Sequence, residues 1–263
     1  MNNFITPRLL SEDDFTSYTT EWQKLVNGLT PEVLTASFAS ASDPKQVINY
    51  VYLPSDYAIE LLSAVGTAAI RTKFVFVEEA AGFSIVLFGV DASGRPTSAY
   101  YLAGVADHPA TVDSTSGQYE VSLDLVTPWI ENWNAQTPDG INTALFDSIY
   151  GPLLGYTYPL DDFLDVLNPV QSTRATQVGT TSEARIAAEN STMALWLNFA
   201  LHKYAKPGAT DGETSNLFST VLTLNTIPEK GAAITLSPGN RYYDVSKPCP
   251  PVCGPLISGL GLA

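Results

Sequence analysis

The most regular hydrophobic pattern in this 263-residue chain lies between Lys73 and Val105. Two runs, Phe74–Val77 and Phe83–Val90, consist largely of aromatic and β-branched residues, which favour strands. The polar turn between them ends at Gly82, which tolerates a positive φ. A third apolar run follows at Ala99–Ala103. The pattern predicts a three-stranded antiparallel meander at the centre of the fold.

Helical spacing dominates the N-terminal part of the chain. Ser11, with an acid three residues later, is typical of a helix N-cap. The apolar stripe that follows at spacings of three and four predicts one buried helical face, made of Phe15, Tyr18, Trp22, Leu25 and Leu29. Thr30-Pro31 predicts the start of a second helix that reaches about Ser40. A strand over Val47–Leu53 and a helix beginning at Pro54-Ser55-Asp56 are expected next.

The second half of the chain contains both the spacing typical of helices and the apolar runs typical of strands. Helices are expected over residues 128–134, 141–150, 160–167 and 184–204, and strands over residues 217–225, 232–236 and 241–245, with weak strand character at 172–181. Pro128 should limit how far the first of these helices extends upstream. Thr180 and Glu183 form a capping box for the last and longest one.

These elements predict an α+β fold in which helices pack around a central antiparallel sheet, with a smaller second sheet near the C-terminus. We expect a single globular domain over residues 1–263, with an internal boundary near residues 107–118 and a short apolar tail at 248–263. Pro54 and Pro159 each introduce a helix, and Tyr100-Tyr101 is echoed by Tyr242-Tyr243. Two diverged halves would explain this echo, and chance explains it equally well.

Composition limits the kinds of molecule that this chain is expected to bind. The apolar fraction of 45% and the charged fraction of 15% are typical of a globular protein. The net charge of -14 disfavours nucleic acid and anionic membranes, because binding phosphates needs clustered Lys and Arg. The first residues lack a basic start followed by a long apolar run, and no stretch is long and apolar enough to span a membrane. An acidic, soluble, cytoplasmic protein is expected.

The most unusual local feature is Cys249-Pro-Pro-Val-Cys253. Unpaired structural thiols are the first interpretation, and a small disulfide closed across a turn is the second. Zinc is a distant third, because the two histidines, His108 and His202, are not at finger spacing. No glycine-rich loop opens a helix after a strand. The sequence therefore predicts no metal site and no cofactor.

A polar loop carries the one candidate for catalysis. Asp107 and His108 follow the central sheet, at a position where functional residues are common. A hydrolase would also need a nucleophile, and the chain has no nucleophile elbow of the Gly-x-Ser-x-Gly type. A small-molecule hydrolase with Asp107 and His108 is thus the alternative function rather than the preferred one.

The preferred hypothesis is a non-enzymatic protein that binds a protein partner or self-associates. The central strands look too uniformly apolar to line a polar site, so binding residues are expected at the margins of the sheet and in the tail. The candidates are Arg71, Tyr100, Tyr101, Tyr242, Tyr243, Leu256 and Ile257.

Overall fold

The computed structural model describes residues 5–105, 110–112, 123–148, 150–167, 193–205, 214–226, 234–236 and 247–248. Its helices are α1 (Glu12–Val26), α2 (Pro31–Ser37), α3 (Ser55–Leu62), α4 (Leu123–Asn134) and α5 (Leu160–Leu167), with 3-10 turns η1 (Glu78–Ala80), η2 (Pro138–Gly140) and η3 (Thr143–Phe146). Its strands are β1 (Arg8–Leu10), β2 (Tyr50–Pro54), β3 (Ala69–Val77), β4 (Gly82–Val90), β5 (Tyr100–Leu102), β6 (Gly104–Val105), β7 (Ala110–Val112), β8 (Asp147–Ser148), β9 (Gly151–Pro152), β10 (Tyr156–Pro159), β11 (Met193–Ala205), β12 (Thr214–Thr226), β13 (Ile234–Leu236) and β14 (Lys247–Pro248).

The described strands form two main antiparallel sheets. One has the order β1-β5-β4-β3-β10-β14, and the other has the order β12-β11-β2-β6. A parallel pair, β7 with β13, and a small hairpin of β8 and β9 complete the strand pairing of the described residues. The mixture of helices and antiparallel sheets confirms the α+β prediction, and the adjacent strands β3, β4 and β5 confirm the central meander.

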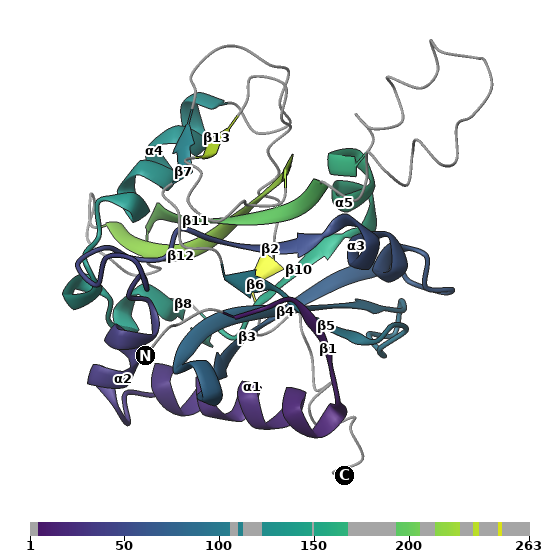
Figure 1. Ribbon diagram of the computed structural model, residues 1–263, viewed down its shortest axis with the longest axis horizontal. Helices are drawn as coiled ribbons and strands as arrows, with labels where there is room; N and C mark the ends of the chain where they lie inside the picture. The colour runs from purple at the N-terminus through teal and green to yellow at the C-terminus, as the bar shows by residue number, and fades with distance from the viewer. Residues whose placement is uncertain are drawn as a thin grey trace.

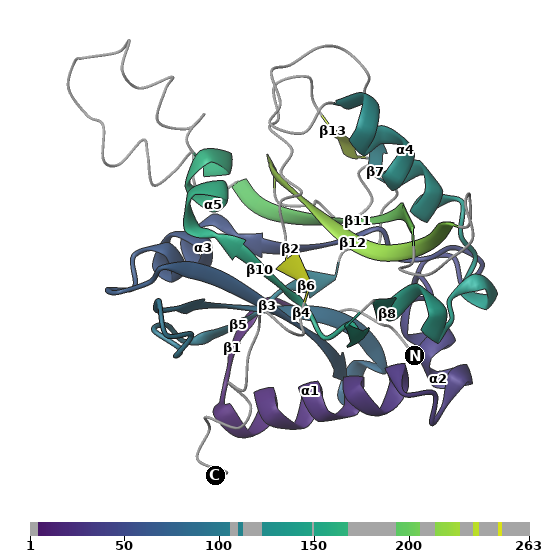
Figure 2. The ribbon, with the colours of Figure 1, turned by 180° about the vertical axis from the view of Figure 1, so that it is seen from behind.

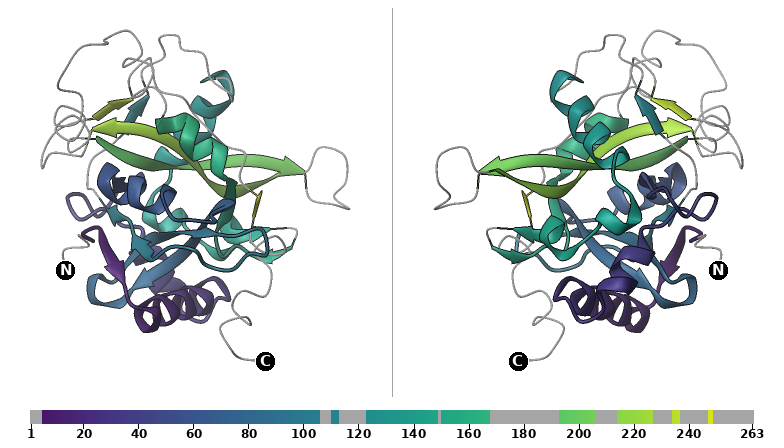
Figure 3. Two further views of the ribbon diagram at one scale, coloured as in Figure 1. Left: turned by 90° about the vertical axis from the view of Figure 1, so that its right-hand side faces the viewer. Right: turned by 90° about the vertical axis from the view of Figure 1, so that its left-hand side faces the viewer.

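The elements stack in layers. In Figure 1 the four-stranded sheet lies over the six-stranded sheet, α1 lies beneath, and α4 lies above. Figure 2 shows the same order from behind, with α3 and α5 together at one end of the sheets. In the side views of Figure 3, the hairpin of β11 and β12 reaches beyond the six-stranded sheet. The core therefore lies mainly between the two sheets.

An aromatic cluster fills the space between the sheets. The ring of Phe218 on β12 lies 5.3 Å from Phe74 on β3 and 5.1 Å from Phe199 on β11. Two tryptophans join the cluster and satisfy their indole N–H groups. Trp22 donates to the Leu153 carbonyl at 3.0 Å, and Trp133 donates to the Ile48 carbonyl at 2.8 Å. Such edge and offset ring contacts add to the free energy of simple burial.

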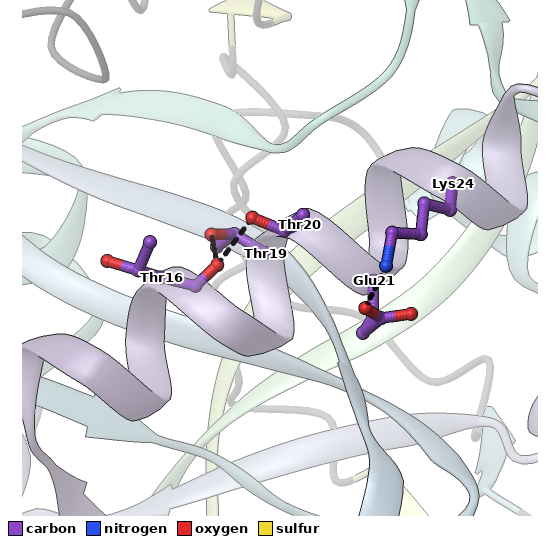
Figure 4. Close-up of polar contacts among 5 residues, drawn as sticks. All are labelled: Thr16, Thr19, Thr20, Glu21 and Lys24. Atoms are coloured by element: carbon purple, nitrogen blue, oxygen red, sulfur yellow. Dashed lines mark hydrogen bonds and ion pairs between the residues drawn. The ribbon is translucent and has the colours of Figure 1, made fainter. Parts of the chain in front are cut away.

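Helix α1 begins where its cap predicts. The Ser11 hydroxyl accepts the Asp14 backbone N–H at 3.1 Å. The predicted stripe is buried as far as Leu25, but Leu29 is 68% exposed because the helix ends before it, at Val26. Figure 4 shows local polar contacts along α1, between residues three and four positions apart. They involve Thr16, Thr19, Thr20, Glu21 and Lys24.

The free edge of β12 is covered by two tyrosines from the other sheet. The Tyr156 hydroxyl donates to the Phe218 carbonyl, and the Tyr158 hydroxyl bonds the Thr220 hydroxyl. A long edge strand is a common site of unwanted pairing with another chain. These contacts hold β12 at two positions and tie the two sheets together.

One large prediction was wrong. Of the helix expected over residues 184–204, the described part forms β11, a strand that lies between β12 and β2. Leu195, Leu197 and Phe199 alternate with Trp196 and Asn198, and all five side chains are buried. A two-residue alternation fits a strand covered on both faces. Pairing with two neighbours outweighed the helical spacing that the same residues also contain.

Smaller corrections concern turns and helix ends. Residues 141–150 contain the 3-10 turn η3 followed by β8, not a helix. Helix α4 begins at Leu123 and includes Pro128, so the proline does not stop it. In the turn between β3 and β4 the positive φ, 48°, belongs to Ala81 rather than to Gly82. The strands expected at 172–181 and 241–245 lie outside the described residues.

Of the possible internal repeat, the described residues show only the first part, a proline followed by a helix. Pro54 ends β2 and Pro159 ends β10, and helices α3 and α5 begin at the next residue. The two units belong to different sheets, and the second tyrosine pair lies outside the described residues. The two-halves interpretation stays a prediction.

Candidate functional site

Two cations are buried side by side on the central strand β3. Arg71 and Lys73 are each only 4% exposed. Two residues apart on a strand, they project from the same face of the sheet. Arg71 lies opposite Phe88 and Lys73 opposite Val86 on the neighbouring strand β4. The pair therefore has apolar neighbours directly across the ladder.

Helix α1 contacts both faces of this sheet: its Phe15 reaches the face of the cations, and its Trp22 reaches Phe74 on the opposite face. The ring of Phe88, opposite Arg71, lies 5.5 Å from the ring of Phe15 on α1. The alternate residue Phe74 points the other way and contacts Phe218 of the four-stranded sheet. The cations thus lie outside the aromatic core, on the face of the six-stranded sheet opposite Phe74.

Strand pairing fixes the cations in this place. β3 is flanked by β4 on one side and by β10 on the other, so its backbone is held along both edges. Thr157 of β10 pairs with Arg71, and Lys247 of β14 pairs with Thr157. A shift of β3 by one residue would turn Arg71 and Lys73 into the aromatic core. The apolar residues of β3 therefore determine where the charges lie.

Neither cation has a counter-charge among the described residues. The Nε and Nη1 atoms of Arg71 are enclosed and make no hydrogen bond. The ion pair present in the described part of the chain joins Lys24 to Glu21 on α1, far from this strand in sequence. A buried charge is normally paired, since its desolvation is expensive. An unpaired, buried pair of like charges is a departure that suggests a ligand.

The electrostatics of the pair follow from its enclosure. Burial lowers the pKa of Arg71 below its usual value, although guanidinium keeps its charge at neutral pH. Burial, and then the charge of Arg71, lower the pKa of Lys73 from 10.5 to about 8. Among the described residues, no carboxylate raises the pKa of either cation. The arrangement can hold an anion, and its amine loses a proton more easily than an ordinary lysine.

The tyrosines predicted as binding residues lie on opposite faces of β5. Tyr100 is partly buried on the side of the cations, where its ring stacks on Phe15 at 4.1 Å. Its ring also lies 5.2 Å from Phe88, the residue opposite Arg71. Tyr101 is buried on the other side, 5.7 Å from Tyr57 of α3. The structure therefore groups Arg71 with Tyr100 and separates both from Tyr101.

The tyrosines also differ in what shifts their ionisation. Burial, and then the Glu12 carboxylate, raise the pKa of Tyr100. Burial, and then Glu60 of α3, raise the pKa of Tyr101. Both phenols therefore stay protonated at neutral pH, and each can donate a hydrogen bond.

The other predicted site residues lie outside the described part of the chain. They are Asp107, His108, Tyr242, Tyr243, Cys249, Cys253, Leu256 and Ile257. His202, expected on a helix, lies on strand β11, where its ring is 5.6 Å from Trp129. The predictions for thiols, tail and loop catalysis stay predictions.

Two acidic side chains near the sheet have structural partners. Glu79 accepts the Tyr18 hydroxyl at 2.7 and 2.8 Å, and Arg8 donates to the same hydroxyl at 3.2 Å. Asp91 accepts backbone N–H groups of Ser93 and Arg95 and so closes the turn after β4. These bonds account for both carboxylates without a ligand.

A second set of enclosed polar atoms lies on the four-stranded sheet. Asn198 donates to the Val221 carbonyl at 3.1 Å and to the Thr223 hydroxyl at 2.9 Å, while its Oδ1 has no partner. The Trp196 indole N–H is likewise enclosed without a partner. These groups are neutral, and leaving them unpaired costs less than leaving a charge unpaired. The cation pair is therefore the stronger candidate.

Comparison with known proteins gives no function for this chain. No protein-family model, curated protein or solved structure matches the chain. Within the described residues, no group of three His, Cys, Asp or Glu could hold a metal ion. No described helix is long and apolar enough to cross a membrane.

Lys73 is the site residue that sequence reasoning missed, and Arg71 was expected at the margin rather than within the sheet. The expectation that these strands are uniformly apolar overlooked both buried cations of β3. A signal was present in the sequence, since two cations at a spacing of two interrupt an otherwise apolar run. Alternation alone places both on one face.

Proposed function

We propose that this chain is a non-enzymatic binding protein that recognises an anionic group, a carboxylate or a phosphate, through Arg71 and Lys73. The observation that supports this proposal is the enclosure of two neighbouring cations that have no counter-charge among the described residues. An anion that binds there would replace the solvation that both groups lose on folding. Guanidinium also matches the planar geometry of a carboxylate.

The net charge of -14 adds a condition on the ligand. At long range the acidic surface repels anions, and this repulsion is screened by salt. Attraction to the cations is local, since a charge pair interacts more strongly away from water. We therefore expect a ligand with one compact anionic group to bind more tightly than a polyanion, which the acidic surface would repel more strongly. The expectation that nucleic acid is not a partner belongs to the same proposal.

The group can come from a free small molecule or from a protein partner, including a second copy of this acidic chain. The proposal therefore includes binding to a protein partner and self-association. A cytoplasmic location is part of the same proposal. The hydrolase alternative rests on Asp107 and His108, and no feature of the described residues supports it.

The test compares unfolding in acetate, phosphate and chloride at matched ionic strength. A ligand that binds only the folded state adds about 1.4 kcal/mol of stability at ten times its Kd. We expect acetate or phosphate to stabilise the wild type and not Arg71→Met. Arg95→Met, at an exposed position of the turn after β4, is the control that should respond as the wild type does. Equal stabilisation of wild type and Arg71→Met would sink the proposal.

The source of the group is resolved by light scattering. If a second copy supplies it, the mass in solution should fall when acetate competes and when Arg71 is replaced by Met. If a small molecule supplies it, the mass should not change while acetate still stabilises the chain. Deletion of residues 255–263 tests the separate expectation that the apolar tail mediates association. An unchanged mass and an unchanged set of captured partners would contradict the role of the tail.

A further inference from the structure

We propose that Lys73 is a nucleophilic amine that condenses reversibly with the carbonyl carbon of a small 2-oxo acid whose carboxylate is held by Arg71. This inference rests on the proposed anion site, and it names the ligand class and the chemistry of that site. It extends the function from simple anion binding to the covalent capture of one kind of carboxylate.

The spacing of the two residues suits such a ligand. Residues two apart on a strand have Cα atoms about 7 Å apart and project from one face. In a 2-oxo acid the carboxylate carbon is bonded directly to the carbonyl carbon. A single small molecule can therefore contact the Arg71 guanidinium with one end and the Lys73 amine with the other.

The surroundings of Lys73 are those of an activated lysine. It is 4% exposed, lies opposite Val86 and follows the buried Thr72 on a strand paired on both sides. Enclosure in apolar surroundings and a neighbouring cation are the two influences that turn a lysine into a nucleophile. The described structure gives Lys73 both and gives it no carboxylate.

The protonation state agrees with this geometry. With a pKa of about 8, about a quarter of the Lys73 side chains are neutral at pH 7.5. An ordinary lysine is neutral in only about one molecule in a thousand at that pH. Lys73 therefore presents a neutral amine roughly 200 times more often than an exposed lysine.

The condensation balances without an oxidant or a reductant. The Nζ lone pair attacks the carbonyl carbon, a C–N bond forms, and the carbonyl oxygen takes a proton to give a carbinolamine. Loss of water then breaks the C–O bond and forms the C=N bond of the imine. The net change is amine plus carbonyl to imine plus water, and hydrolysis returns both.

The experiment traps this imine with cyanoborohydride. The full chain is incubated with pyruvate at pH 7.5, the imine is reduced to a stable amine, and the modified lysine is located by peptide mass spectrometry. We expect Lys73 to be modified at least about tenfold faster than the exposed Lys24 and Lys203, since the neutral fraction favours it. Equal or slower modification of Lys73 would overturn the inference.

Two further arms separate this inference from the anion site. Propanal has the carbonyl but no carboxylate, and acetate has the carboxylate but no carbonyl. We expect acetate to slow the modification of wild-type Lys73 by pyruvate, and Arg71→Met to slow pyruvate more than propanal. If acetate stabilises the chain but pyruvate does not modify Lys73, the inference fails while the anion site stands. If propanal modifies Lys73 as fast as pyruvate and acetate has no effect, both fail.

Discussion

Replacing Lys73 by Met should stabilise the protein at neutral pH. The change keeps an unbranched side chain of similar length and removes a buried charge that has no ion-pair partner in the described part of the chain. Because the folded state lowers the pKa of Lys73 from 10.5 to about 8, folding acts against protonation. The resulting penalty is complete below pH 8, falls as pH rises, and vanishes above pH 10.5. It amounts to about 3 kcal/mol at pH 7 and about 1.4 kcal/mol at pH 9.5.

The assay is urea unfolding of wild type and Lys73→Met at pH 7 and pH 9.5, with chloride as the buffer anion. The variant should be more stable by up to about 3 kcal/mol at pH 7, and its advantage should shrink by more than half at pH 9.5. Lys203→Met, at an exposed position on β11, is the matched control and should change stability by less than about 0.5 kcal/mol at either pH. A destabilised Lys73→Met, or an advantage that does not depend on pH, would refute the reasoning.

Three further predictions concern the scaffold that holds the site. Gly155→Ala should destabilise the fold severely and lower its thermal midpoint in a melting scan, because φ is +144° and a Cβ would lie 2.1 Å from the Thr72 carbonyl oxygen. Tyr158→Phe should cost about 1 kcal/mol in chemical unfolding by leaving a buried Thr220 hydroxyl without its partner, and an unchanged midpoint would count against the tie between sheets. Ser11→Ala should cost about 1 kcal/mol through loss of the α1 cap, and Ser11→Asp should restore most of it.

Local chemistry was enough to predict much of the first half of the fold. The cap at Ser11 and the helical stripe located α1, and the aromatic and β-branched runs located β3 and β4. These elements agree with their local patterns, so no tertiary information was needed. The failure at Leu29 concerns one turn of helix, which the chain ends early at Val26.

The second half shows where local patterns fail. Residues of β11 satisfy a helical spacing and a strand alternation at once, and only pairing with β2 and β12 decides between them. β2 is far away in sequence, so a local window contains no sign of it. Long-range pairing of this kind is the usual reason that tertiary context overrides propensity.

The site was only partly predictable. Arg71 and Tyr100 were both candidates, and the structure places them on one face, linked by Phe88. The sequence could not show that Lys73 is buried, because burial depends on the packing around β3, which lies between β4 and β10 in the sheet. A charged residue in an apolar run is ambiguous until its neighbours are known.

The central claim is that Arg71 and Lys73 bind an anion. The most direct test is a crystal structure of the full chain, with crystals grown in bromide and the bromide ions located by their anomalous signal. A bromide ion bound by the Arg71 guanidinium and the Lys73 amine is the predicted result. The account would be contradicted if bromide bound only elsewhere, or if Arg71 and Lys73 were paired with carboxylates of the chain itself.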